Sequence, residues 1–129
     1  MPYPGVGALL DGLAARGLPV AIFSNKPHEF TCLAVRGLLP SFSFARVLGV
    51  GEGTPRKPNP QGALAIAAEV GVPPAAWLYC GDTDTDMATA SAAGMVAVGA
   101  LWGFRSADEL RAAGARHLLR RPEDLLELI

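Results

Sequence analysis

Three of the six aspartates in the sequence stand within five residues, at Asp82, Asp84 and Asp86, directly after the apolar run 77–80. Clustered carboxylate oxygens at a strand end suit Mg²⁺, which takes hard oxygen ligands and keeps several of its waters. Asp82 would stand at the strand tip, and Asp86, four residues on, would share a face with it once a helix begins. We therefore predict that Asp82 and Asp86 hold Mg²⁺, while Asp84 points elsewhere and is solvated or caps the helix.

Two other interpretations of this acidic loop have to be weighed. Asp and Thr are favoured immediately before a helix, so the cluster could serve only for capping, although capping needs a single such residue. A calcium-binding EF-hand loop begins with the same alternation of aspartates, but it requires Gly at the sixth position and Glu at the twelfth. Here these positions are Met87 and Ala93, which excludes an EF-hand.

The two lysines of the chain, Lys26 and Lys57, both fall in predicted loops, whereas nine arginines supply the remaining basic charge. Lys offers a compact point charge that suits a position facing phosphate oxygens and a neighbouring carboxylate. Pro58 and Pro60 stiffen the loop around Lys57, which favours a functional role there. The alternative is chance placement in exposed loops, and it is harder to exclude for Lys26.

Ser24 and Asn25 end a short apolar run and precede Lys26. Their hydroxyl, amide and backbone N–H groups could together bind a phosphate group. Alone, the pair would be interpreted as a simple cap or turn, because Ser and Asn side chains bond readily to nearby backbone. The presence of two other polar strand ends in the same chain favours a binding role for Ser24, Asn25 and Lys26.

Helical and strand patterns alternate along the whole chain, which predicts an α/β fold with a parallel sheet flanked by helices. The expected strands are 19–24, 47–50, 77–80, 95–98 and 117–119, and the expected helices are 6–14, 28–37, 61–70, 86–93, 106–113 and 122–129. In such sheets ligands bind beyond the carboxyl ends of the strands. The loops holding Ser24, Lys57 and Asp82 should therefore lie on one side of the sheet.

Composition limits the class of protein. The 129 residues are 50% hydrophobic and 18% charged, which is typical of one globular domain spanning 1–129. A net charge of −1 gives no support to a nucleic-acid or anionic-membrane partner. We find no signal peptide or spanning segment, and Cys32 and Cys80 lie in apolar surroundings that suit buried, reduced thiols. A cytoplasmic location is the expectation.

Three motifs, in order, resemble those of the haloacid-dehalogenase superfamily, specifically its phosphoglycolate-phosphatase-like hydrolases. Ser24–Lys26 resembles the second motif, Arg56–Pro60 the third and Gly81–Asp86 the fourth, and Leu101–Arg105 resembles the C-terminal stretch. The resemblance implies a Rossmann-like core and hydrolysis of a small phosphomonoester through an aspartyl-phosphate. It also implies Mg²⁺ at Asp82 and Asp86, phosphoryl binding by Ser24, Asn25 and Lys26, and catalytic roles for Ser24 and Lys57.

One departure from the family is large. The first motif, which supplies the nucleophilic aspartate after a strand, does not occur before Ser24. In the family that strand lies between the strands ending at Ser24 and Asp82, and a cap domain accompanies it. We therefore expect an incomplete core that is inactive alone and binds Mg²⁺ weakly. The chain is a fragment, or a second chain or dimer mate covers the gap, or the two strands close up directly.

Rival functions remain open at this stage. The chain could be a truncated, non-catalytic remnant that serves as a scaffold or binding module. It could also belong to a sugar-phosphate mutase of the same superfamily, because the cap that separates mutase from phosphatase is absent. The metal loop disfavours a metal-free dehalogenase, and the lack of an acidic pair after the first strand disfavours a receiver domain. The expected partner is a small phosphorylated metabolite, not nucleic acid or a membrane.

Overall fold

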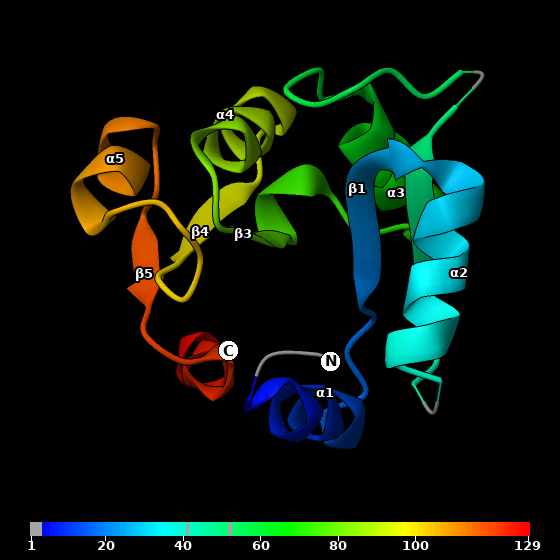
Figure 1. The fold of residues 1–129 in the computed structure, drawn as a ribbon, viewed down its shortest axis with the longest axis horizontal. Helices are drawn as coiled ribbons and strands as arrows, with labels where there is room; N and C mark the ends of the chain where they lie inside the picture. Colours follow the sequence, from blue (N-terminus) through cyan, green and yellow to red (C-terminus); the bar gives the residue numbers. More distant parts are fainter. Residues whose placement is uncertain (1–3, 41, 52) are drawn as a thin grey trace. The chain divides into compact units, whose positions relative to one another are not determined.

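The structure is a computed structural model that describes residues 4–40, 42–51 and 53–129. It contains two compact units, each described here by itself. The first comprises Met1–Arg56 with Pro122–Ile129, and the second comprises Lys57–Arg121. Parallel strands flanked by helices make up both units, which confirms the predicted α/β class (Figure 1).

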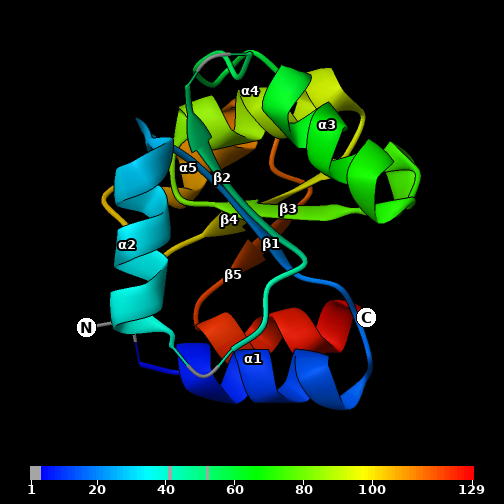
Figure 2. The same cartoon turned by 90° about the vertical axis from the view of Figure 1, so that its right-hand side faces the viewer.

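In the first unit, two parallel strands pair with each other, and a helix packs against them. Its elements are α1 Val6–Ala15, β1 Ala21–Pro27, α2 His28–Leu38, β2 Arg46–Val50 and the 3₁₀ helix η2 Pro122–Leu128. β1 pairs with β2 in a register that sets Phe23 opposite Leu48, and the pairing becomes irregular between Phe23 and Pro27. Figure 2 shows α1 running beside the C-terminal helix, where Leu10, Leu13 and Leu125 are buried.

The second unit is a three-stranded parallel sheet in the order β3-β4-β5. Its elements are α3 Gln61–Val70, the 3₁₀ helix η1 Pro74–Ala76, β3 Leu78–Gly81, α4 Asp84–Ala93, β4 Val96–Ala100, α5 Ala107–Ala112 and β5 His117–Leu119. Helices α4 and α5 pack on the sheet (Figure 1). The side chains of Met87, Val98 and Leu110, one from each of α4, β4 and α5, are fully buried.

Local signals placed several helix ends correctly. Gly71 and Gly94 end α3 and α4 in the left-handed conformation, with φ of 81° and 74°, which costs glycine little. Ser106 and Glu109 have the three-residue spacing of a capping box and form one, in which the Ser106 hydroxyl accepts the Glu109 N–H at 3.1 Å. Gly37, predicted to stop α2, lies inside the helix, which continues to Leu38.

Other boundaries differ from the predictions. Residues 24–26 form the irregular end of β1 instead of a loop, and the last helix is 3₁₀ instead of α. Helix α4 begins at Asp84, two residues before the predicted start, because Thr83 caps it. Asn59 has a side chain that favours the N-cap of α3, but Pro60 has that position, while the Asn59 side chain still accepts the Gln61 N–H at 2.9 Å.

The expected single sheet is two sheets in the part of the chain that the structure describes. There β1 pairs with β2 alone and β3 with β4 alone, so each has one edge without a strand partner. The predicted burial of the two thiols is wrong: Cys32 is half-buried, and Cys80, on β3, is exposed. No helix among the described residues has the length and apolar character needed to cross a membrane.

Candidate active site

Asp86 is the centre of the acidic loop in the second unit. It lies in the first turn of α4 with only 7% of the residue exposed. Thr83, the N-cap, accepts the Asp86 N–H at 3.1 Å and donates its hydroxyl to Asp86 Oδ2 at 3.0 Å. The same Oδ2 accepts the Asp82 N–H at 3.2 Å. Because a helix N-terminus favours negative charge, the sequence places this carboxylate where a helix stabilises it.

Lys57 reaches the other oxygen of Asp86. Its Nζ lies 2.7 Å from Asp86 Oδ1, and the two side chains are only 12% and 10% exposed. A charge-assisted bond of this length in a nearly buried setting is stronger than an ordinary surface ion pair. The peptide bond between Lys57 and Pro58 is cis. The structure thus brings together two of the predicted site residues that are 29 positions apart in the sequence.

Asp82 follows β3 directly and is half-buried. Its backbone N–H donates to Asp86, but within the described residues its carboxylate has no hydrogen bond or ion pair. Asp84, by contrast, points to solvent with 62% of its side chain exposed, and Arg105 Nε lies 3.6 Å from its Oδ1. The prediction that Asp84 points away is confirmed. Asp82 is the carboxylate that stays available to a ligand.

Of the two predicted Mg²⁺ ligands, Asp82 is the one whose carboxylate fits that role. Mg²⁺ is commonly held by one or two carboxylates with waters and substrate phosphates completing the shell, so Asp82 suits a ligand role. Both oxygens of Asp86 are already engaged by Lys57, Thr83 and the Asp82 N–H. Among the described residues no group of three or more His, Cys, Asp or Glu side chains could enclose a metal. The assignment of Asp82 and Asp86 to a metal stays a prediction.

Gly81 gives Asp86 its space. A methyl group added at Gly81 would stand 2.5 Å from Asp86 Cγ, closer than any normal contact between carbons. The Gly81-Asp82 pair therefore combines two requirements at the end of β3. Gly81 has no side chain, which leaves space for the Asp86 side chain against the end of β3. Asp82, the next residue, presents its carboxylate.

Tyr79 lies near this site, and the sequence analysis did not single it out. Its hydroxyl is buried and has no hydrogen-bond partner among the described residues. Burial, and next the negative charge of Asp86, hold the pKa of the Tyr79 hydroxyl above its ordinary value. Tyr79 therefore stays neutral, and its hydroxyl makes no hydrogen bond to the Asp86 carboxylate. Alternation along β3 could have indicated that Tyr79 and Gly81 share a face.

Replacing Tyr79 by Phe is expected to preserve or raise stability. A buried hydroxyl without a partner costs about 1–3 kcal/mol, and Phe keeps the ring while removing that group. Urea unfolding of the Tyr79→Phe chain should therefore show a midpoint equal to or above that of the parent. A clear loss of stability would mean that the hydroxyl has a partner in solution.

Ser24, Asn25 and Lys26 lie in the first unit. Ser24 and Asn25 are half-buried at the end of β1, and Lys26 is exposed. The Ser24 Oγ accepts the Lys26 N–H at 3.1 Å, the local turn weighed as an alternative to phosphate binding. Thr31, buried in α2, donates toward the Lys26 carbonyl at 3.2 Å and so fastens the strand end to the helix. The phosphoryl-binding role of these three residues stays a prediction.

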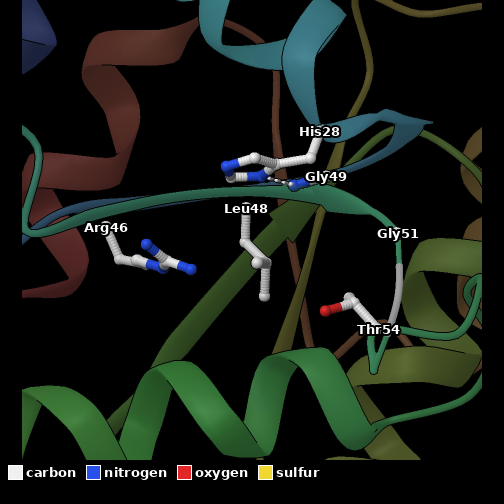
Figure 3. A pocket seen from close by; sticks show the side chains of 6 residues that line it. All are labelled: His28, Arg46, Leu48, Gly49, Gly51 and Thr54. Carbon is white, nitrogen blue, oxygen red and sulfur yellow. Dashed lines mark hydrogen bonds between the residues drawn. The ribbon is translucent and has the colours of Figure 1, made fainter.

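His28 is half-buried at the start of α2, although an isolated histidine between a predicted strand and a predicted helix suggests a loop or surface residue. Its Nδ1 accepts the Gly49 N–H at 3.1 Å, and its Nε2 lies 3.5 Å from Cys32 Sγ. A pocket of about 220 Å³ is lined here by His28, Arg46, Leu48, Gly49, Gly51 and Thr54. Figure 3 shows the His28 ring on one side of β2 and the side chains of Arg46 and Leu48 on the other. The His28 ring and the Arg46 guanidinium therefore do not converge on one ligand.

Comparison with known proteins places the chain in a family. Residues 1–94 match the model for haloacid dehalogenase-like hydrolases, and the chain belongs to that family. It is 39% identical to the phosphoglycolate phosphatase of Xylella fastidiosa over 95% of this chain and 56% of that protein. The chain thus spans about half the length of the curated relatives it matches.

Solved structures agree with this assignment. A putative phosphoglycolate phosphatase from Lactobacillus delbrueckii superposes with a TM-score of 0.92 at 36% identity, over 99% of this chain and 53% of that one. A haloacid-dehalogenase-family hydrolase from Deinococcus radiodurans, solved with bound phosphate and sodium, gives 0.86 at 28% identity, over 95% and 56%. The predicted family and its Rossmann-like fold are confirmed.

Proposed function

We propose that this chain is part of a Mg²⁺-dependent phosphatase that hydrolyses a small phosphomonoester in the manner of phosphoglycolate phosphatase. The observation that carries the proposal is the arrangement of Lys57, Asp86 and Asp82. Lys57 is held by Asp86, and of the three aspartates in the acidic loop only Asp82 has a carboxylate without a hydrogen bond or ion pair to the described residues. The names of the relatives supply the substrate class, and the Deinococcus structure shows a related protein with phosphate bound.

Each residue has a definite task in this proposal. Lys57 carries a positive charge that stabilises the phosphoryl oxygens as charge moves in the transition state, and Asp86 fixes its position. Asp82 holds Mg²⁺, which would neutralise charge on the same phosphoryl group. Ser24, Asn25 and Lys26 bind the phosphoryl oxygens through hydroxyl, amide and backbone N–H donors. Within these 129 residues no aspartate is placed as the nucleophile, so we propose that the chain alone does not turn over.

The direct test is metal binding by the 129-residue chain. Mn²⁺, used as a paramagnetic substitute for Mg²⁺, should broaden the amide signals around residues 81–86 only at millimolar concentration, because one free carboxylate binds weakly. Asp82→Asn should abolish the broadening, and the matched variant Asp84→Asn should retain it. Tight binding, or binding that survives Asp82→Asn, would contradict the assignment of Asp82.

A second measurement tests the expected lack of turnover. The purified chain is incubated with phosphoglycolate or p-nitrophenyl phosphate in the presence of Mg²⁺, and no phosphate release is expected. Release that Asp82→Asn abolishes would show that these residues already hold a complete catalytic site.

A further inference from the structure

In the loop between β4 and α5, Gly103 packs against Asp82 of the acidic loop. A methyl group added at Gly103 would stand 2.6 Å from Asp82 Cβ and 2.9 Å from Asp82 Cγ. Carbon atoms that are not bonded normally approach to about 3.5–4.0 Å. Because the backbone fixes Asp82 Cβ, rotation of the Asp82 side chain cannot remove this conflict. The contact therefore requires glycine at position 103.

This packing matters because no polar contact with the described residues restrains the Asp82 carboxylate. It has no hydrogen bond or ion pair there, whereas the carboxylate of Asp86 has three hydrogen bonds. Within the described part of the chain, Arg105, two residues after Gly103, has a polar contact only with exposed Asp84 at 3.6 Å, and an exposed pair of this kind contributes little. The backbone of Gly103 is consequently a direct steric restraint on the Asp82 side chain.

We propose that Gly103 is a positioning residue for Asp82, which limits the orientations of the free carboxylate and holds it toward its ligand. The proposal rests on the proposed function, because its chemical consequence is metal affinity. Positioning by a neighbour is worth about 10–100-fold in affinity in characterised metal sites. Gly103 should therefore influence Asp82 without contacting the metal or the substrate.

The test compares Gly103→Ala with Gly37→Ala in the 129-residue chain. Gly37 lies in α2, and a methyl group there would meet nothing within 4 Å. In metal-free protein, Gly103→Ala should shift the ¹³C signal of the Asp82 carboxyl group, and in a Mn²⁺ titration it should weaken binding roughly tenfold. Gly37→Ala should leave both unchanged. Parent-like values of both in Gly103→Ala would overturn the positioning role.

A double-mutant cycle covers the case in which Gly103→Ala folds poorly. Asp82→Gly removes the side chain that the new methyl group would strike, so adding Gly103→Ala to it should cost much less stability than adding it to the parent. Equal costs in both backgrounds would overturn the inference. If the parent binds no Mn²⁺, the proposed metal site fails, and the carboxyl signal and this cycle still decide the role of Gly103.

Discussion

Asp86→Ala should lower the free energy of unfolding by about 3–5 kcal/mol, because it removes the carboxylate that offsets the charge of the nearly buried Lys57 ammonium. The substitution also removes the acceptor of the Thr83 hydroxyl and the Asp82 N–H, which together organise the start of α4. Breaking a buried pair costs this much because the remaining charge keeps its desolvation penalty.

Asp84→Ala is the matched control, since it makes the same change two residues away in the same helical turn. The Asp84 side chain is 62% exposed and its contact with Arg105 spans 3.6 Å, so its loss should change stability by no more than about 0.5 kcal/mol. Urea unfolding of the two variants compares them directly. Similar losses would show that the Lys57–Asp86 pair is solvated in solution and contributes little.

A refinement of this experiment separates charge from packing. Lys57→Met keeps the length of the side chain and removes its charge, and it leaves Asp86 with its hydrogen bonds from Thr83 and Asp82. In the Lys57→Met background, Asp86→Ala should cost less than it does in the parent. The difference between the two costs is the coupling between the two residues.

Local chemistry accounts for what the sequence predicted well. The capping box at Ser106 and Glu109 and the helix ends at Gly71 and Gly94 depend on residues a few positions apart. The outward direction of Asp84 follows from the spacing of the three aspartates. At Gly37 a local rule failed because the helix can pass through glycine when nothing requires a positive φ.

Contacts between distant segments explain what the sequence could not predict. The motif order suggested that Lys57 and Asp86 serve one site, but the spacing of Asp82 and Asp86 made both look like equivalent ligands. Only the fold shows that Asp86 is occupied by Lys57 and Thr83, whereas Asp82 is open. The sequence did not indicate the roles of Tyr79 and Gly103 either. One sequence does not show that a hydroxyl lacks a partner or which side chain a glycine packs against.

Gly49→Ala should be the most damaging glycine substitution in the first unit. A methyl group at this buried position in β2 would stand 2.5 Å from His28 Cα and 2.6 Å from both the Lys26 carbonyl oxygen and Thr31 Oγ1. Two of these atoms belong to the backbone, so no side-chain rotation relieves the conflict. We expect a loss of about 3 kcal/mol in the free energy of unfolding, at the upper end for an overpacked core.

Gly51→Ala, two residues along the chain, provides the control for Gly49→Ala because a methyl group there would meet nothing within 4 Å. Its stability should stay within about 0.5 kcal/mol of the parent. Hydrogen exchange adds a local measurement, since the Gly49 N–H is bonded to His28 Nδ1 and should lose protection only in the Gly49 variant. Because Lys26 and Thr31 lie against Gly49, the same substitution should displace the predicted phosphate-binding end of β1. Equal behaviour of the two variants would show that this strand end is not packed as tightly in solution.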